Sequence, residues 1–229
     1  MREIALDTET TGISPRDGHR IIEIGALELM HHLPTGRKLH LYINPEREID
    51  DGAVAVHGIT SDFLADKPVF ADIVDEFLAF VGDDPMVIHN ASFDMGFLNA
   101  ELKRLDRPVL PMAQSIDTLM MARKKFPGAQ ANLDALCRRF EIDNSHRDLH
   151  GALVDADLLA AVYIELLGGR QPGLSLDSDS QIQAGDQGAP NSTDPDPSFH
   201  FDAKPIRPIR AHAPTAEELK AHAKFLEEL

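Results

Sequence analysis

The chain of 229 residues has a single cysteine and no apolar segment long enough to cross a bilayer. One cysteine, Cys137, excludes an internal disulfide and any zinc site built from several cysteines, so we interpret it as a small core residue. A membrane helix needs about 20 consecutive apolar residues, and no run approaches that length. The stretch from Ile4 to Leu6 is too short for a signal peptide. These absences favour a soluble cytoplasmic protein without a membrane partner.

The sequence also lacks the excess of positive charge that is typical of nucleic-acid-binding proteins. Its formal net charge is −16, with 28 acids against 16 lysines and arginines in residues 1–168, and 10 against 6 in residues 169–229. Neither part is a basic arm, so we expect weak long-range attraction to DNA. A nucleic-acid substrate would have to be held by bound cations, by a deep local pocket or through a partner protein.

What the sequence does contain is a series of strand patterns that later alternate with helical patterns. The strand patterns cover residues 3–9, 21–29, 38–44, 86–90 and 115–117. The helical patterns cover residues 70–81, 93–105, 118–124, 133–140 and 151–167. The first three strands in succession predict an antiparallel meander. The later alternation predicts an α/β fold in which helices flank a mixed sheet.

The composition changes sharply after Gly169. Residues 170–198 are dominated by Gly, Ser, Asp, Gln and Pro without periodicity, which predicts a disordered linker. Thr215 with Glu218 three residues later is a capping-box pattern, and it predicts a short C-terminal helix. The predicted organisation is a globular domain over 1–168, a flexible linker over 169–198 and a tail over 199–229.

Two acids in the first strand are candidates for chemistry. Side chains two residues apart in a strand point to one face, so Asp7 and Glu9 project together. Buried like charges repel by several kcal/mol at about 4 Å in a partly screened medium. Divalent cations prefer oxygen ligands and would relieve that repulsion. The pair predicts a metal site, although an edge strand with a solvated outer face would explain it equally well.

Two later motifs each place an acid near the start of a helix. HNASFD ends in Asp94, where a carboxylate also complements the positive end of the helix dipole. HGALVD places His150 at a helix entrance and Asp155 one turn into a largely apolar helix. A lone histidine here more often has a structural role. Beside carboxylates that bind two metal ions, His150 becomes a candidate general base for an attacking water.

Two other acids are left out of the predicted site. Asp117 precedes a helix and is interpreted as its N-cap. Asp157 is two residues from Asp155, about 200° around the helix, and cannot share its face.

Taken together, LDTETTG, HNASFD and HGALVD resemble the three motifs of the DEDD exonuclease superfamily in its histidine-containing branch, DEDDh. The likeness covers about residues 3–168. Within the superfamily, IIEIGALEL, VHGIT, FPGAQANLDALCRRFEIDNS and LHGALVDADLLA are most similar to the epsilon family of proofreading subunits of bacterial DNA polymerase III. The resemblance implies a ribonuclease H-like fold and hydrolysis of a DNA 3′ end with two divalent cations, Mg²⁺ or Mn²⁺.

The resemblance also implies roles for individual residues. Asp7, Glu9 and Asp155 would ligate metal directly, and Asp94 directly or through water. His150 would deprotonate the water, and the products would be a 5′-nucleoside monophosphate and a single-stranded or frayed DNA 3′ end shortened by one nucleotide. Gly52 could contribute only its backbone to substrate binding. The predicted substrate contacts are Asp7, Glu9, Thr10, Thr11, Gly12, Gly52, Val56, His57 and Asp155.

The C-terminal part predicts protein partners. QPGLSL, Gln171 to Leu176, resembles the peptides by which replication proteins dock onto the sliding clamp, although chance also explains so short a pattern. The segment from about Phe199 is expected to bind the polymerase alpha subunit, with its helix folding on contact. A linker of about 30 residues spans roughly 30 Å and gives effective concentrations on the order of millimolar, so the polymerase would supply DNA affinity. A small accessory subunit on the exonuclease domain is also considered.

Three alternative functions are compatible with the sequence. The first is a DEDDh exonuclease that acts on RNA 3′ ends. The second is an adaptor without catalytic activity that bridges clamp and polymerase, although clustered acids have no use in an adaptor. The third is a stand-alone repair exonuclease, which would not copurify with a replicative polymerase.

Overall fold

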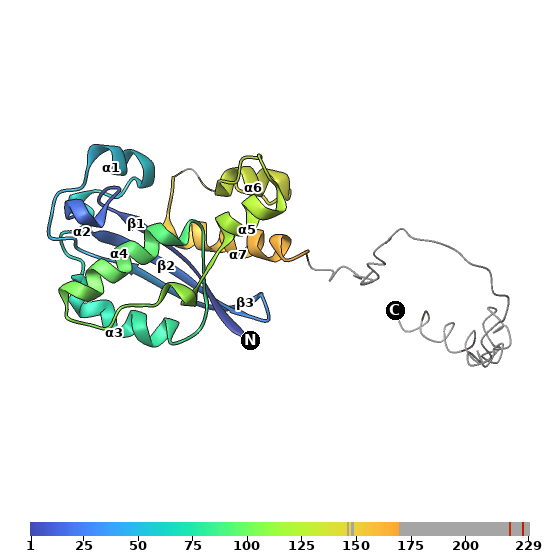
Figure 1. The fold of residues 1–229 in the computed structure, drawn as a ribbon, viewed down its shortest axis with the longest axis horizontal. Coiled ribbons are helices and arrows are strands. Elements are labelled where there is room, and N and C mark those ends of the chain that lie inside the picture. The colour runs from blue at the N-terminus through green and yellow to red at the C-terminus, as the bar shows by residue number, and fades with distance from the viewer. Residues whose placement is uncertain (146, 148, 170–219, 221–225, 227–229) are drawn as a thin grey trace, which may run out of the picture. The chain divides into compact units, whose positions relative to one another are not determined.

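Five strands form one mixed sheet in the order β3-β2-β1-β4-β5. Its three long strands, β1, β2 and β3, are labelled in Figure 1. The antiparallel neighbours are β1 (Arg2–Thr10), β2 (Ile21–Met30) and β3 (Leu33–Tyr42). The short strand β4 (Met86–Ile88) runs parallel to β1, and β5 (Ser115–Asp117) runs parallel to β4. The predicted meander and mixed sheet are confirmed. The third strand begins at Leu33 rather than at residue 38, because the chain reverses tightly at His31 and His32, both with positive φ.

The helices alternate with the later strands as predicted. They are α1 (Asp51–His57), α2 (Ser61–Leu64), α3 (Phe70–Val81), α4 (Ala91–Arg104), α5 (Thr118–Lys125), α6 (Leu133–Arg139) and α7 (Ala152–Leu166), with 3-10 turns η1 (Pro15–Asp17) and η2 (Met112–Gln114). The strong apolar periodicity of α3 explains why its bounds match the prediction. The short helices α1 and α2 were not predicted, because neither is long enough to show a helical period.

The helices cover both faces of the sheet. Helices α3 and α4 pack on one face, where Leu6 of β1 meets Phe77 and Phe97. Helices α5, α6 and α7 pack on the other face, against Ala5 and its neighbours. Alternate residues of β1 therefore enter two different cores, as expected for a strand that is covered on both sides. Cys137 is fully buried in the second core, which confirms its predicted place.

The computed structural model describes residues 1–145, 147, 149–169, 220 and 226. The predicted linker beyond residue 169, the clamp-binding peptide 171–176 and the tail with its terminal helix therefore lie outside the described residues, apart from two isolated positions. Among the described residues, no helix combines the length and the apolar character that crossing a membrane would require.

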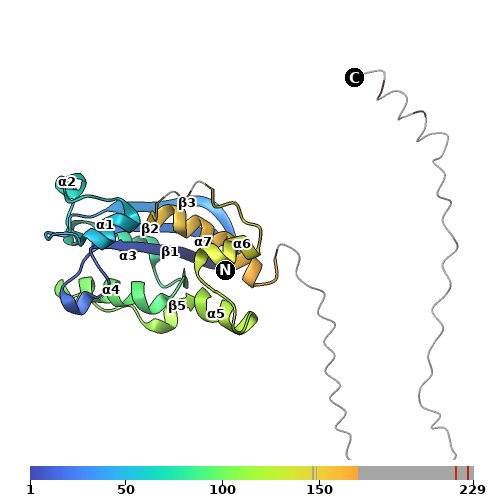
Figure 2. The same cartoon turned by 90° about the horizontal axis from the view of Figure 1, so that it is seen from above.

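The elements that carry the predicted site meet at the carboxyl ends of the central strands. The parallel strands β1 and β4 both end there, and α4 begins directly after β4. Figures 1 and 2 both show α1 and α2 toward one end of the sheet and α5 and α6 toward the other. Crevices at the carboxyl ends of strands are where α/β sheets most often bind ligands.

Candidate active site

A pocket of about 450 Å³, which we call the carboxylate pocket, contains all five predicted catalytic residues. These residues, Asp7, Glu9, Asp94, His150 and Asp155, come from β1, α4 and the start of α7. Its full lining is Asp7, Thr8, Glu9, His89, Asn90, Phe93, Asp94, Asn132, Leu133, Asp134, Arg147, His150 and Asp155. Acids that are distant along the chain thus share one cavity.

Asp7 and Glu9 occupy alternate positions of β1, so both face the carboxylate pocket. β1 lies between β2 and β4 in the sheet. Glu9 is buried, with 8% of its surface exposed. The alternative explanation of a solvated edge strand is therefore wrong.

Asp94 is positioned by the turn that joins β4 to α4. Asn90 adopts a left-handed conformation, with φ of 65°, and the helix begins at the next residue. Asp94 in the first turn is almost fully buried and accepts a hydrogen bond of 2.7 Å from Oγ1 of Thr8. Thr8 lies between Asp7 and Glu9 in β1. This bond therefore holds Asp94 and the first turn of α4 close to the two acids of the strand.

The first turn of α7 is anchored on β2. Oε2 of Glu23 accepts a hydrogen bond of 3.2 Å from the backbone N–H of Ala152, while Oε1 lies 2.6 Å from Nε2 of His40. Gly25 allows this close approach, since a β-carbon there would lie 2.2 Å from the carbonyl carbon of Ala152. Asp155 follows within the first turn and is 3% exposed. A buried glutamate thus positions the helix that carries the final predicted ligand.

The electrostatics of the carboxylate pocket oppose simultaneous ionisation of its acids. Burial raises the pKa of Asp7 well above its ordinary value, and the nearby charges of Asp94, Glu9 and Asp155 raise it further. Burial likewise raises the pKa of Glu9 to about 8 and that of Asp94 to about 7. Ligand atoms of Glu9, His150 and Asp155 lie within 4.8 Å of one another. Clustered oxygen donors that resist ionisation without a countercharge fit divalent cations such as Mg²⁺ or Mn²⁺.

Arg147 is the residue with the most contacts to the predicted site among those that the sequence analysis missed. Its guanidinium donates to both carboxylate oxygens of Asp155, over 2.5 Å and 2.6 Å, and to Oδ1 of Asp134 over 2.7 Å. The Arg147 side chain is only 7% exposed. One arginine in a loop gives no periodic or motif signal, so only its contacts reveal its place.

Arg147 also determines the tautomer of His150. Its Nη2 lies 2.8 Å from Nδ1 of the imidazole. Because arginine can only donate, Nδ1 accepts this bond, and a neutral His150 carries its proton on Nε2. In this arrangement Nε2 cannot take a proton from water. Action as a base requires either that Arg147 leaves Nδ1 or that the imidazole, whose side chain is 45% exposed, turns.

A second pocket of about 390 Å³, which we call the apolar pocket, adjoins the first and shares Thr8, Glu9 and Phe93 with it. Among its lining are the predicted nucleotide contacts Thr10, Gly12, Gly52, Val56 and His57. Phe93 and Ile13 also line it, and they were not predicted because their types are ordinary in a core or a loop. The lining residues of the apolar pocket are far apart along the chain, and the fold brings them to one cavity.

His57 is the most informative polar group of the apolar pocket. It ends α1 and is buried, rather than lying in a loop. Its Nδ1 accepts a hydrogen bond of 3.0 Å from the backbone N–H of Ile59, which leaves the proton of the neutral ring on Nε2. Nε2 has no hydrogen-bond partner among the described residues. Burial lowers the pKa of His57, which keeps the ring neutral.

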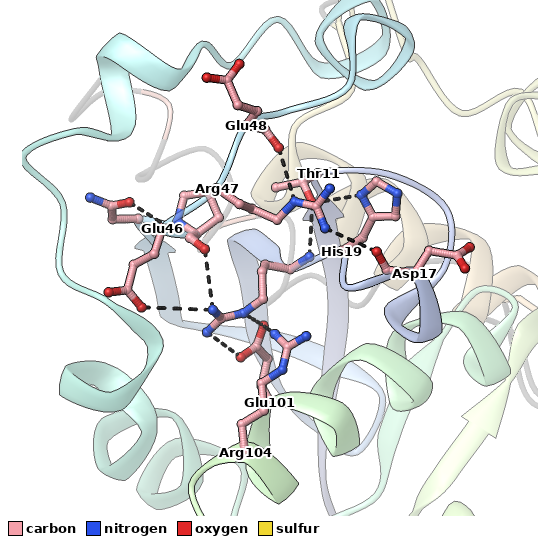
Figure 3. Close-up of polar contacts among 11 residues, drawn as sticks. Thr11, Asp17, His19, Glu46, Arg47, Glu48, Glu101 and Arg104 are labelled. Atoms are coloured by element: carbon pink, nitrogen blue, oxygen red, sulfur yellow. Dashed lines mark hydrogen bonds and ion pairs between the residues drawn. The ribbon is translucent and has the colours of Figure 1, made fainter.

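Thr11 is the predicted substrate contact that the structure brings to neither pocket. It is fully buried, and its Oγ1 lies 3.1 Å from Nδ1 of His19 (Figure 3). The same Oγ1 accepts a hydrogen bond from the backbone N–H of Arg20. Its own N–H donates to the carbonyl of Arg20, and its carbonyl accepts from Asp50. Thr11 therefore supports the loop after β1, and its predicted contact with substrate stays a prediction.

The loop after β1 is tied to α4 by a buried ion pair. Arg20 donates to both oxygens of Glu101, over 2.6 Å and 2.8 Å, and lies 3.9 Å from Glu46; both acids are labelled in Figure 3. Gly12 is required for the packing of this loop, since a β-carbon there would lie 2.3 Å from the His19 ring. The two walls of the apolar pocket are thereby held at a set spacing.

The raised pKa values predict that, without divalent cations, the protein becomes less stable as pH rises. Between the ordinary pKa of Glu9 at 4.5 and its folded value of about 8, the folded state holds more protons than the unfolded state. Stability present at low pH is therefore lost as pH rises through the folded value. We expect thermal unfolding in EDTA to occur at a lower temperature near pH 9 than near pH 5, with Mg²⁺ reducing the difference.

Matched variants isolate the contribution of this pocket. Glu9→Gln should flatten the pH dependence in EDTA. Asp157→Asn, which removes an exposed acid of α7, should leave it unchanged. An identical slope for wild type and Glu9→Gln would contradict the assignment of the raised pKa to Glu9.

Comparisons with known proteins agree with this geometry. The family described as Exonuclease matches residues 4–163. The DNA polymerase III subunit epsilon of Rickettsia conorii is 50% identical over 229 residues, which cover 99% of this chain and 95% of that protein. Those of Salmonella typhimurium and Escherichia coli K12 are 48% and 46% identical over 194 residues, covering 81% of this chain and 79% of each protein.

Solved structures show the same fold. Exonuclease X in complex with 5′ overhanging duplex DNA has a TM-score of 0.57 and 29% identity, over 72% of this chain and 90% of that chain. The nuclease domain of 3′hExo, a DEDDh family member bound to rAMP, has a TM-score of 0.62 and 20% identity, over 72% and 91% of the two chains. The second likeness concerns the fold alone, and it supports the ribonuclease H-like architecture.

Proposed function

The chain belongs to the exonuclease family, and on that premise we propose that its two adjoining pockets hold and cleave the last nucleotide of a DNA 3′ end. It is a metal-dependent 3′→5′ exonuclease, the proofreading subunit of a replicative DNA polymerase. The observation that carries the proposal is the convergence of four acids and His150 in the carboxylate pocket. A cytoplasmic location is proposed with this function.

The carboxylates are proposed as the metal ligands. Asp7, Glu9 and Asp155 would hold the cations directly, and Asp94, whose Oδ1 is occupied by Thr8, directly or through water. Two Mg²⁺ or Mn²⁺ ions, when bound, lower the pKa of water and neutralise the charge that develops on the scissile phosphate. The raised pKa values of Asp7 and Glu9 support this assignment, because their ionisation is favourable only beside a positive charge.

His150 is proposed as the base that takes the proton of the attacking water at Nε2. For this, Arg147 releases Nδ1, so that the neutral ring can carry its proton there. The products are a 5′-nucleoside monophosphate and a strand that is one nucleotide shorter. The position of His150 at the entrance of α7, next to buried Asp155, supports this role.

The apolar pocket is proposed to hold the terminal nucleotide. Val56 and Phe93 offer apolar surface to a base. Nε2 of His57 is buried and without a hydrogen-bond partner among the described residues, so the ring would have to turn toward the pocket to donate to a sugar or base oxygen. Thr10 and Gly12 form the wall beside β1, whereas Gly52 offers only its backbone. Apolar contacts do not distinguish one base from another, which suits an enzyme that must remove any mispaired nucleotide.

Replacing His150 by glutamine should lower kcat on a 3′-mispaired DNA primer about 10²- to 10⁴-fold, the usual contribution of general base catalysis, with a smaller change in KM. The pH profile of kcat should also change on its acidic side, because the base that must be deprotonated for catalysis is gone. Single-turnover digestion in Mg²⁺ at several pH values measures the rate of cleavage and its pH dependence. Asp157→Asn is the matched control and should keep the wild-type rate.

The same assay separates the alternative functions. Wild-type and His150→Gln proteins with equal rates would contradict the proposed base. Faster degradation of a matched RNA oligomer than of DNA would favour an RNA-directed exonuclease. Failure of the wild type to digest either strand in Mg²⁺ would favour an adaptor without catalytic activity.

The partner segments are proposals that rest on sequence, since they lie beyond the described residues. We propose that Gln171–Leu176 docks on the sliding clamp and that residues from about Phe199 bind the polymerase alpha subunit. In a pull-down with each purified partner, Gln171→Ala with Leu174→Ala should weaken only clamp binding. Truncation after Gly168 should abolish polymerase binding. Unchanged retention by either partner would exclude the corresponding segment. A small accessory subunit is a further proposal.

A further inference from the structure

A third pocket, of about 380 Å³, extends the carboxylate pocket in another direction, and we call it the arginine pocket. It shares His89, Asn90 and Asn132 with the carboxylate pocket but no lining residue with the apolar pocket. The carboxylate pocket therefore lies between the other two cavities. The lining of the arginine pocket is His89, Asn90, Leu119, Arg123, Ala129, Ala131 and Asn132.

The arginine pocket is chemically the opposite of its neighbour. No acid is among its lining residues, whereas five acids line the carboxylate pocket. Oδ1 of Asn132 accepts from the backbone N–H of Ala135 over 2.8 Å, and Oδ1 of Asn90 accepts from Ser92. Their amide N–H groups are therefore left as donors at the junction of the two pockets. Together with the guanidinium of Arg123, these donors suit an anionic ligand.

The charge around Arg123 also differs from that of the rest of the chain. Residues 117–141 contain five lysines and arginines against three acids, Asp117, Asp134 and Glu141, although the chain has a net charge of −16. Asp117 is not among the lining residues, but its Oδ1 accepts from the backbone N–H of Asn90. Arg123 lies in the last turn of α5, is exposed, and forms no ion pair with any described residue. Helices α5 and α6, which carry these cations, both pack against α7 (Figures 1 and 2).

The direction of the substrate follows from the order of the pockets. With the terminal nucleoside in the apolar pocket, its 5′ phosphate lies over the carboxylates, because that phosphate is the one attacked. The strand on the 5′ side of the scissile bond must then leave the carboxylate pocket by another side. The arginine pocket adjoins the carboxylate pocket through residues that the apolar pocket does not share. Its lining offers N–H donors and no acid, as a phosphodiester requires.

We propose that the arginine pocket binds the DNA backbone immediately 5′ to the scissile bond, with Arg123 as a phosphate-binding residue. The proposal rests on the proposed function, since it takes the apolar pocket as the place of the terminal nucleotide. The ligand class is a single-stranded phosphodiester. The small side chains of Ala129 and Ala131 cannot distinguish one base from another, so binding should not depend on sequence. A local cationic site lets a strongly acidic chain hold DNA near its reactive centre.

The test is a series of short single-stranded substrates. A dinucleotide contains only the scissile phosphate, and a trinucleotide is the shortest substrate with an upstream phosphate. For the wild type, kcat/KM should rise about tenfold from the dinucleotide to the trinucleotide and tetranucleotide. Arg123→Ala should lose most of that rise and reduce the slope of log kcat/KM against log salt by about 0.7. Arg123→Glu should make the longer substrates poorer than the dinucleotide.

A matched control uses a cation elsewhere. Lys103 is exposed in the last turn of α4, roughly 13 Å along the helix axis from Asp94, and Lys103→Ala should keep the wild-type length profile. Thermal unfolding verifies that each variant is folded.

The outcomes distinguish a failure of phosphate binding by Arg123 from a failure of the proposed exonuclease function. A wild-type length profile for Arg123→Ala would overturn the proposal, as would an equal loss on the dinucleotide and the longer substrates. A variant that loses only its binding to the polymerase subunit would assign the cation to a protein partner and would also overturn it. No hydrolysis of any substrate by the wild type would instead contradict the proposed function.

Discussion

Replacing Asp7 by asparagine should abolish exonuclease activity and yet make the protein harder to unfold in EDTA. The activity falls because one proposed ligand of the cations is lost. Metal ions supply several kcal/mol of transition-state stabilisation, so we expect a loss on the order of 10³-fold or more. Stability rises because burial and the charges of Asp94, Glu9 and Asp155 oppose ionisation of Asp7, and a neutral amide of the same shape removes that repulsion.

Digestion of a mispaired primer and thermal unfolding in EDTA measure these two effects on the same protein. Asp157→Asn provides the control, since Asp157 lies exposed on α7 and outside the pocket. It should change neither quantity. An Asp7→Asn protein that digests DNA at the wild-type rate would remove Asp7 from the site. An unfolding temperature below that of the wild type would show that the Asp7 carboxylate has a stabilising partner in the folded protein.

Replacing Arg147 by alanine should have the opposite effect on stability and lower the free energy of unfolding by about 3–5 kcal/mol. Asp155 is 3% exposed, and Arg147 donates to both of its oxygens. Without the guanidinium, a buried carboxylate is left without its main countercharge. Urea unfolding in EDTA near neutral pH measures the loss, and Mg²⁺ should restore part of it, since a cation can replace the guanidinium.

The control for this variant is Arg138→Ala, which removes an exposed arginine in the last turn of α6. It should change the free energy of unfolding by less than about 0.5 kcal/mol. Arg147→Lys should lie between the two, because lysine keeps the charge but cannot bind both oxygens of one carboxylate in a planar fork. If Arg147→Ala proved as stable as wild type, Asp155 would have to be neutral or solvated in the folded protein.

The two variants separate the charges of one pocket into those that oppose folding and those that support it. Asp7 faces other acids, so its removal relieves the fold while it removes function. Arg147 stabilises Asp155 and holds the imidazole of His150 in the tautomer that cannot accept a proton on Nε2. We therefore expect the proposed binding of cations at Asp155 and the proposed release of His150 to be coupled, because one guanidinium contacts both residues.

Local features of the fold were predictable, and non-local ones were not. The bounds of α3 follow from its apolar period, and Asp117 caps α5 as expected, accepting from the N–H groups of Leu119 and Met120. Helix α1 went unrecognised, although it carries Val56 and His57. The hydrogen bonds of Thr11 within its loop were not predicted, because a threonine in a loop gives no sign of which way it faces.

The sequence by itself determined which acids can act together and on which elements they stand. In a strand or a helix, the direction of a side chain depends on its neighbours along the chain, and Asp7, Glu9 and Asp155 could be placed from those alone. Only the tertiary structure decided the depth of these acids, the raised pKa values of Asp7 and Glu9, and the pairing of Asp155 with Arg147. Burial and ion pairing depend on residues that are distant in the chain, so no local pattern encodes them.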